Sequence, residues 1–167
     1  VKSNYARLYK IMIKILFICH GNICRSAMAE FIMKKMVSDA GFGERFEIAS
    51  AATSTEEIGN PVYQPAKEML AAHGIGCSGK TARQMKPDDY IYYDMLVGMD
   101  QENMYYMKRM YGGGTDKKLH LLLDYSDHPR DVADPWYTRD FQAAWDDIYE
   151  GCTALTRYLL KTLPARL

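Results

Sequence analysis

The sequence lacks the features of a secreted, membrane-spanning or nucleic-acid-coating protein. Its four cysteines are too few for a disulfide framework and do not have the spacing of a zinc site. The apolar run at residues 11–19 is interrupted by Lys14 and is much shorter than the roughly 20 residues of a membrane span. The formal net charge is zero, from 21 basic and 21 acidic side chains, which argues against a nucleic-acid partner. We therefore expect a cytoplasmic protein with no metal, no other cofactor and no membrane insertion.

Length and composition are typical of one globular domain. Of the 167 residues, 48% are hydrophobic and 25% are charged, and a chain of this length can bury about two thirds of its unfolded surface. No repeat, low-complexity segment or interior linker divides the chain. Residues 1–11 are polar and basic, so we expect a poorly ordered N-terminal extension followed by a single domain at residues 12–167.

Apolar runs and helical segments alternate along the chain. Four runs have the composition of buried strands, and they lie at residues 11–19, 46–52, 93–99 and 119–123. Four segments have helical apolar spacing or capping signals, and they lie at residues 26–41, 61–74, 100–112 and 138–162. For the second of these helices, Asn60 is the expected N-cap and Pro61 the first residue. This alternation predicts an α/β fold, a single-domain three-layer arrangement with a four-stranded parallel sheet flanked by helices on both faces.

A phosphate-loop pattern, G-x-x-x-x-G-K-T, is present at residues 74–81. This pattern binds nucleotides when a strand precedes it and a helix follows it. Here the preceding residues 66–73 are strong helix formers that end at a glycine, which is typical of a helix C-terminus. We therefore do not expect a nucleotide site in this segment.

Residues 19–26, C-H-G-N-I-C-R-S, join the first predicted strand to the first predicted helix. Ligands bind at the carboxyl ends of parallel strands, where a helix N-terminus offers free N–H donors and partial positive charge. These donors, Arg25 and the Ser26 hydroxyl favour an ionised Cys19, so we expect a nucleophilic thiolate at neutral pH. The backbone N–H groups and the planar guanidinium of Arg25 suit the three free oxygens of a phosphate group.

Two further residues shape this segment, which we call the nucleophile loop. Gly21 admits backbone angles that a Cβ would obstruct, and Asn22 suits a left-handed turn that its side chain braces. The alternative is that Cys19 is a buried structural cysteine. Packing does not need polar Asn22, Arg25 and Ser26 beside it, so we favour the catalytic interpretation.

Displacement at phosphorus also needs an acid to protonate the leaving oxygen. Asp134 lies in an acidic segment, residues 124–150, that follows the last predicted strand. Loops after parallel strands converge on one edge of the sheet, so Asp134 can reach Cys19. Pro135 holds Asp134 in an extended conformation, and Trp136 and Tyr137 supply aromatic walls. The alternative is that Asp134 is an ordinary turn aspartate before proline. If Asp134 is considered without the nucleophile loop, this alternative is the better interpretation.

Taken together, these motifs resemble the low-molecular-weight protein tyrosine phosphatase family, and its bacterial members in particular. The resemblance covers most of the chain from Met12 to about Leu160. The matching segments are residues 19–26, 50–61, 73–75, 82–84, 99–100 and 131–137. The family's fold, a four-stranded parallel sheet flanked by helices, agrees with the predicted elements.

The resemblance implies a role for each residue. Cys19 is the nucleophile that forms a cysteinyl-phosphate, Arg25 clamps the phosphate and Asp134 acts as general acid and then as base. Ser26 supports the leaving thiolate and Asn22 braces the loop, with His73 nearby. The implied substrate is a phosphotyrosine-containing protein, with phosphate or a similar oxyanion in the active site. The candidate substrate-binding residues are His20, Gly21, Asn22, Ile23, Cys24, Ser26, Glu56, Trp136 and Tyr137.

Three positions distinguish or qualify the resemblance. Glu56 stands where many members place an aromatic residue facing the substrate, so we expect a preference shifted away from acidic phosphopeptides. Ile23 stands where related phosphoarginine phosphatases carry threonine, and its apolar side chain favours phosphotyrosine, with phosphoarginine as the alternative. In many members the cysteine matching Cys24 forms a reversible disulfide with the nucleophile, which limits over-oxidation. Simple packing of Cys24 is the alternative.

The main rival function is a thioredoxin-coupled arsenate reductase of the same fold. That class requires two further cysteines, close together on a mobile segment, to relay a disulfide. Cys77 and Cys152 are far apart in the sequence, and Cys152 lies on the apolar side of the last predicted helix. A binding module without activity is disfavoured because the predicted nucleophile, clamp and acid are all present.

Overall fold

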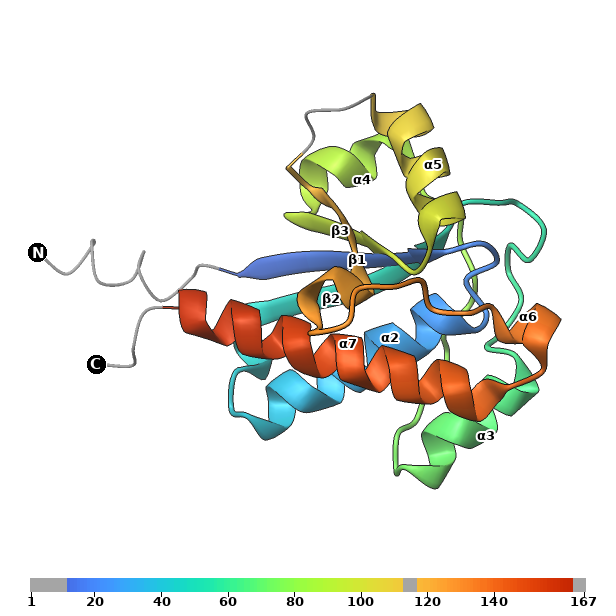
Figure 1. The fold of residues 1–167 in the computed structure, drawn as a ribbon, viewed down its shortest axis with the longest axis horizontal. Helices are drawn as coiled ribbons and strands as arrows, with labels where there is room; N and C mark the ends of the chain where they lie inside the picture. Colours follow the sequence, from blue (N-terminus) through green and yellow to red (C-terminus); the bar gives the residue numbers. More distant parts are fainter. Residues whose placement is uncertain (1–11, 113–116, 164–167) are drawn as a thin grey trace, which may run out of the picture.

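The computed structural model describes residues 12–112 and 117–163 and contains one parallel sheet between two layers of helices (Figure 1). The predicted extension at residues 1–11 lies outside the described residues. The strands are β1 (Ile13–Cys19), β2 (Phe46–Ala52), β3 (Met95–Gly98) and β4 (Leu119–Leu121). The α-helices are α2 (Arg25–Asp39), α3 (Gln64–Ala72), α4 (Pro87–Tyr92), α5 (Gln101–Tyr111), α6 (Pro135–Thr138) and α7 (Phe141–Thr162). Two 3-10 turns are η1 (Gly43–Arg45) and η2 (Leu122–Tyr125).

Strand β1 is buried on both faces, as its composition predicts. Successive side chains of a strand point to opposite sides of the sheet. Ile15 and Phe17 belong to the larger core, to which α2, α3 and α7 contribute. Leu16 and Ile18 belong to the smaller core, on the side of α4 and α5. Figure 1 shows these two groups of helices on opposite sides of the sheet, which confirms the predicted three-layer α/β fold.

The predicted start of the second helix is wrong. Helix α3 begins at Gln64, and the proline in its first turn is Pro65. Pro61 instead forms an isolated bridge with Thr81, while the carbonyl of Asn60 accepts a hydrogen bond from the Ala82 N–H at 2.8 Å. Contacts with a segment about twenty residues away therefore override the local capping signal. The phosphate-loop pattern at residues 74–81 follows helix α3 and continues as turns, without the strand that a nucleotide site requires.

Other differences concern short elements. Helix α4 has six residues and was not predicted, because so short a segment carries little periodicity. The last predicted strand ends at Leu121 and turns into η2. The last predicted helix starts at Phe141 rather than Thr138, and a separate short helix, α6, precedes it. Arg139 adopts a left-handed φ of +60° after α6, and Asp140 caps α7 by accepting from the Ala143 N–H at 2.9 Å.

The strand order, β2-β1-β3-β4, creates a switch point beside β1. The chain passes from β1 to β2 on one side of it and then crosses to β3 on the other side. In parallel sheets a crevice forms at the carboxyl ends of the strands at such a point. Strand β1 ends at Cys19 and α2 begins at Arg25, so the nucleophile loop lies at this crevice.

Candidate active site

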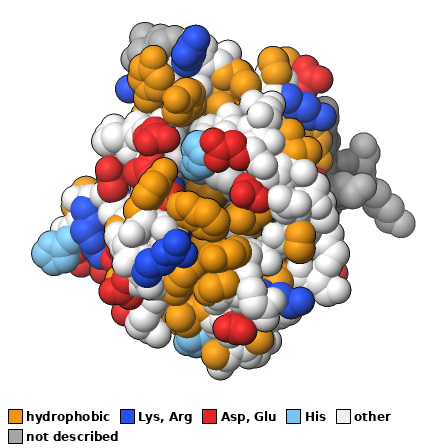
Figure 2. Space-filling view, turned by 90° about the vertical axis from the view of Figure 1, so that its right-hand side faces the viewer, with side chains coloured by type: hydrophobic (Ala, Val, Ile, Leu, Met, Phe, Trp, Pro, Cys, Tyr) orange, Lys and Arg blue, Asp and Glu red, His pale blue; other side chains and the backbone are white. Residues whose placement is uncertain are grey.

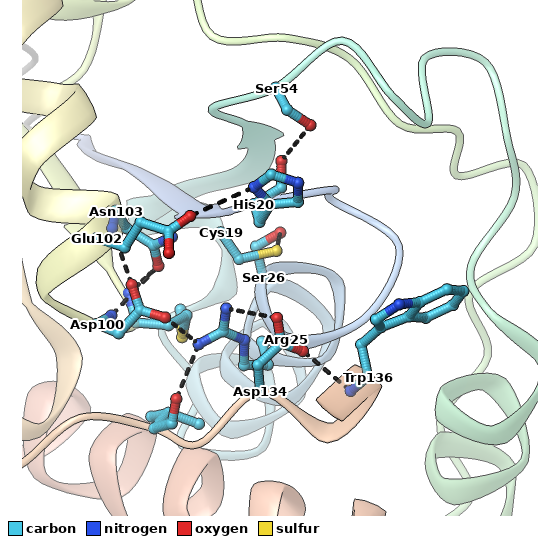
Figure 3. Close-up of polar contacts among 12 residues, drawn as sticks. Cys19, His20, Arg25, Ser26, Ser54, Asp100, Glu102, Asn103, Asp134 and Trp136 are labelled. Carbon is cyan, nitrogen blue, oxygen red and sulfur yellow. Dashed lines mark hydrogen bonds and ion pairs between the residues drawn. The ribbon is translucent and has the colours of Figure 1, made fainter. Parts of the chain in front are cut away.

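The nucleophile loop surrounds the sulfur of Cys19 with donors (Figure 3). The backbone N–H of Asn22 donates to Cys19 Sγ at 3.3 Å, and Ser26 Oγ lies 3.0 Å from the same atom. Asn22 has a φ of +60°, the left-handed conformation that the sequence predicts for it. The predicted need for unusual backbone angles at Gly21 is wrong, because Gly21 is not among the residues with positive φ. A Cβ at Gly21 would instead lie 3.3 Å from Glu57 Cγ, so the position is limited by space.

Arg25 lies beneath the loop and is only 2% exposed. Its Nη1 donates to Asp100 Oδ2 at 2.7 Å and to the Val132 carbonyl at 2.8 Å, and its Nη2 lies 3.3 Å from Asp134 Oδ2 (Figure 3). Burial by itself would lower the pKa of Arg25, but the negative charges of Cys19, Asp100 and Asp134 outweigh it and raise the pKa. The pocket therefore has a permanent positive charge in a fixed orientation.

Asp100 is a site residue that the sequence analysis did not identify, since it was placed only at the start of a predicted helix and in a segment of the family resemblance, with no role in the site. It does cap α5, where its Oδ1 accepts from the Asn103 N–H at 2.8 Å, but its other carboxylate oxygen holds Arg25. A signal was available, because Asp100 follows β3 and β3 pairs with β1. The rule that placed Cys19 at the sheet edge also places Asp100 there.

Asp134 reaches the pocket through the acid loop, residues 131–137. The Val132 N–H donates to the Met99 carbonyl at 2.9 Å, which ties the acid loop to the end of β3. Asp134 Oδ1 accepts from the Trp136 N–H at 3.0 Å, so the carboxylate caps the short helix α6 while Oδ2 faces Arg25. The predicted proximity of Asp134 and Cys19 is seen, since both line one pocket.

That pocket has a volume of about 210 Å³. Apart from Ser26, which is fully buried below the loop, every predicted site residue lines it, and Glu57 is an unpredicted addition. Figure 2 shows this face of the molecule, with acidic side chains and a histidine gathered on one side and hydrophobic side chains on the other. The lining residues are Cys19, His20, Gly21, Asn22, Ile23, Cys24, Arg25, Glu56, Glu57, Asp134, Trp136 and Tyr137.

The acidic wall of the pocket is tied to the nucleophile loop through His20. His20 Nε2 lies 2.9 Å from Glu56 Oε2, and His20 Nδ1 lies 3.7 Å from Glu102 Oε1. The Ser54 hydroxyl donates to the His20 carbonyl at 2.9 Å (Figure 3). One side chain of the loop thus bridges the segment after β2 and the first turn of α5.

The opposite wall is aromatic. The ring centroids of Trp136 and Tyr63 are 5.3 Å apart, and the guanidinium of Arg139 lies 5.6 Å from the Trp136 ring. Tyr137 is the most exposed residue of the wall, at 81%. His73, which the resemblance places near the nucleophile loop, stacks on Trp145 at 4.0 Å instead and does not line this pocket.

All four cysteines are free thiols in the structure. Burial raises the pKa of Cys24, and the negative charge of Cys19 raises it further. Cys24 is therefore a neutral thiol at neutral pH. The predicted disulfide between Cys19 and Cys24 remains a prediction.

The fold and the site together are those of a small α/β phosphatase. The family model described as low molecular weight phosphotyrosine protein phosphatase matches residues 14–165. The chain belongs to this family, as the motifs predict, and the family's members are phosphoric monoester hydrolases.

Relatives with known names support this assignment. The low molecular weight protein-tyrosine-phosphatase YfkJ of Bacillus subtilis is 36% identical over 152 residues, which cover 90% of this chain and 97% of that protein. The crystal structure of YfkJ matches with a TM-score of 0.89 over 92% of this chain and 98% of that one, at 35% identity. The crystal structure of a Drosophila arginine phosphatase matches with a TM-score of 0.81 at 26% identity, over 88% of this chain and 98% of that one.

The part of the chain that the structure describes contains no candidate membrane span and no candidate metal site. None of the helices in this part of the chain has the length and apolar character needed to cross a membrane. Within the same residues, no cluster of three or more His, Cys, Asp or Glu side chains could hold a metal ion.

Proposed function

We propose that the protein hydrolyses phosphotyrosine monoesters of proteins through a cysteinyl-phosphate on Cys19, with Asp134 as general acid and then general base. The observation that carries this proposal is the meeting of three groups in one pocket: a thiol among loop donors, a buried arginine and a carboxylate from a distant loop. Each group matches one requirement of displacement at phosphorus.

In the first step, the Cys19 thiolate attacks phosphorus. The sulfur–phosphorus bond forms, the bond to the tyrosyl oxygen breaks, and the Asp134 carboxyl group gives its proton to that oxygen. Before substrate binds, Arg25 faces the Asp134 carboxylate. A phosphate dianion takes over this guanidinium, and its negative charge favours the protonated acid that the step needs.

In the second step, water replaces the sulfur. The Asp134 carboxylate accepts a proton from the water that attacks phosphorus, and phosphate leaves as the thiolate is regenerated. The Ser26 hydroxyl, 3.0 Å from Cys19 Sγ, supports the departing thiolate by donating a hydrogen bond. Arg25 and the loop N–H groups hold the equatorial oxygens throughout.

The walls of the pocket support a phosphotyrosine substrate. Ile23 and Trp136 offer apolar contact for an aromatic ring, and both line the space above Cys19. Glu56 and Glu57 line the other side, so flanking acidic residues of a substrate meet like charge. The expected preference is for phosphopeptides that are not acidic.

The alternative substrate is phosphoarginine, since a structural relative carries the name arginine phosphatase. Carboxylates at positions 56 and 57 could pair with a guanidinium, but Ile23 offers it no acceptor. Initial rates on one peptide carrying either phosphotyrosine or phosphoarginine decide between the two. Faster phosphoarginine turnover overturns the choice of phosphotyrosine.

Thiol-relay chemistry has weaker support. Cys152 lies in α7, fully buried, and its thiol donates to the Ala29 carbonyl at 3.7 Å. Burial raises the pKa of both Cys77 and Cys152, which disfavours the thiolates that an arsenate reductase relay needs. The free thiols support the cytoplasm as the proposed compartment.

The direct test is hydrolysis of p-nitrophenyl phosphate and of a phosphotyrosine peptide by the wild type and by Cys19→Ser. We expect turnover by the wild type in the presence of a chelator, and no turnover by the variant. Acid quenching during wild-type turnover with labelled substrate would trap phosphate on the Cys19 peptide. Full activity of Cys19→Ser, or activity that requires a metal, overturns the mechanism.

A further inference from the structure

A network of buried polar side chains, which we call the polar network, leads from the Cys19 sulfur to the carboxylate of Glu30 on α2. Each member lies within hydrogen-bonding distance of the next, and all four side chains are at most 4% exposed. The proposed catalytic steps use only the member nearest the sulfur. The members in order are Ser26, Asn22, Ser50 and Glu30.

The Glu30 end determines the direction of the hydrogen bonds at Ser50. An ionised carboxylate only accepts, so the Ser50 hydroxyl donates to Glu30 Oε1 at 2.6 Å. With its proton committed, Ser50 Oγ accepts from Asn22 Nδ2 at 2.9 Å. The Asn22 amide is held in the same orientation from its other side, where the Arg83 backbone N–H donates to Asn22 Oδ1 at 3.2 Å.

This amide orientation affects the nucleophile. Asn22 Nδ2 donates its second hydrogen to Ser26 Oγ at 2.8 Å. Ser26 therefore keeps its own hydrogen for Cys19 Sγ, 3.0 Å away. In the flipped amide, Oδ1 would face Ser26 and compete with the sulfur for that hydrogen. The orientation seen is the one that stabilises a thiolate.

A buried carboxylate such as Glu30 needs compensating positive charge. Lys34 Nζ lies 2.7 Å from Glu30 Oε2, but its side chain is 45% exposed and water screens the pair. Lys80 is 13% exposed, lies 3.5 Å from Glu30 Oε1 and donates to the Ser50 carbonyl at 3.0 Å. The pKa of Lys80 is lowered, mainly by burial and also by the charges of Arg83 and Lys34, although the nearby Glu30 carboxylate opposes this shift. Lys80 is thus the less exposed of the two lysine counter-ions of Glu30.

We propose that Lys80 is a positioning residue for Cys19. Its ammonium group balances the charge of the Glu30 carboxylate, and Glu30, through Ser50, holds Asn22 in the orientation that leaves Ser26 free to donate to the thiolate. The charged groups facing Glu30 and Lys80 are Lys34 on α2 and Arg83 on the segment after α3. Lys80 does not line the pocket, so it acts only through the nucleophile loop. The proposal rests on Cys19 being the nucleophile of the proposed function.

The test measures the pH dependence of Cys19 alkylation by iodoacetamide in the full chain. This rate follows thiolate formation without any phosphoester, and fragment ions from mass spectrometry assign the modification to Cys19 rather than Cys24. For Lys80→Met we expect the midpoint to rise by about half to one pH unit, because the ionised form loses a stabilising interaction. At pH values below both midpoints the rate falls about 3- to 10-fold. Lys80→Arg keeps the charge and restores most of the shift.

A matched control is available on α2, the helix that carries Glu30. Lys35 is an exposed lysine of α2 that pairs with Asp39 at 3.0 Å, so Lys35→Met removes one positive charge and leaves every contact of the polar network in place. We expect its midpoint to equal that of the wild type. A Lys80→Met midpoint that coincides with the Lys35→Met midpoint overturns the proposal.

Two further results bear on the proposal: a Lys80→Met variant that does not fold, and a wild type that does not hydrolyse phosphotyrosine. If circular dichroism shows that Lys80→Met does not fold, Ser50→Ala can be used instead. It interrupts the polar network between Glu30 and Asn22 and should raise the midpoint similarly. An unchanged midpoint in Ser50→Ala then overturns the proposal. Absence of phosphotyrosine hydrolysis by the wild type, with the alkylation shift intact, contradicts the proposed function and leaves the role of Lys80 standing.

Discussion

At the floor of the pocket, Asn22, Arg25 and Ser26 are almost completely buried, whereas at its rim Trp136 is 45% and Tyr137 81% exposed. Each floor side chain has at least two hydrogen-bond partners, drawn from several different elements. At the rim, Trp136 contacts the Tyr63 ring, and Trp136 and Tyr137 both line the open side of the pocket. We therefore expect the floor to supply fixed charge to any phosphoester and the rim to select among substrates.

This comparison predicts that floor substitutions slow all substrates alike, with effects mainly on kcat. Rim substitutions should instead change relative rates between substrates. Asp134 belongs to both regions, because its backbone lies on the rim and one of its oxygens faces Arg25.

The largest effect is expected for Arg25→Lys at the floor. A lysine keeps the charge but cannot hold Asp100, the Val132 carbonyl and two phosphate oxygens with one planar fork. We expect kcat to fall by about three orders of magnitude or more for p-nitrophenyl phosphate and phosphopeptides alike. A loss confined to one substrate would contradict the assignment of Arg25 to the floor.

For Asp134→Ala we expect kcat on phosphotyrosine to fall by about two to four orders of magnitude, because the leaving oxygen loses its proton donor. Aryl phosphates with more acidic leaving groups need less protonation and should lose less. Steady-state rates on a series of aryl phosphates measure this dependence. An equal loss across the series would show that Asp134 is not the acid.

Asp100→Asn tests the ion pair that Asp100 makes with Nη1 of Arg25. The neutral amide weakens the 2.7 Å ion pair but can still accept a hydrogen bond, so Arg25 is less firmly held. We expect kcat to fall about tenfold with KM little changed. Asp88→Asn, at an exposed site in the first turn of α4, is the control and should match the wild type.

Glu56→Gln tests the rim. Removing one negative charge should raise the rate on acidic phosphopeptides severalfold relative to basic ones, and kcat on p-nitrophenyl phosphate should hardly change. Paired peptides that differ only in flanking charge provide the measurement. Unchanged relative rates would show that the acidic wall does not select substrates.

The last prediction concerns Cys24, which we expect to have little effect on turnover as long as the enzyme is not oxidised. After brief peroxide treatment of the wild type, we expect mass spectrometry to detect a Cys19–Cys24 crosslink and dithiothreitol to restore activity. Sulfinic acid at Cys19 without any crosslink would show that Cys24 only packs.

The strands, the helix after the nucleophile loop and most site residues could be predicted because their signals are local. β2 matches its predicted bounds, and β1 is recognisable from an apolar run in which Lys14 is the one charged residue. The start of α3 and the division before α7 could not be predicted. They depend on a bridge between Pro61 and Thr81 and on a left-handed Arg139, which local propensity does not encode.

The partners of the site residues were harder to predict than the residues themselves. Asp100 meets Arg25, and Glu30 meets Ser50 and Lys80, across sequence separations that only the strand order and the packing of α2 against β2 bring together. A polar residue's type indicates what it can bind. Its burial and neighbours, which depend on the whole fold, decide what it does bind.

The sequence by itself determined the chemistry of the nucleophile loop, because Cys19, Asn22, Arg25 and Ser26 are joined by one short turn between a strand and a helix. It also determined that the strands would be parallel, and hence that the loops would share one edge of the sheet. Only the tertiary structure decided that Arg25 lies between two carboxylates and that Lys80 lies beside Glu30 at the end of the polar network. The physical reason is that local backbone preferences act over a few residues, whereas charge pairing and burial require the assembled core.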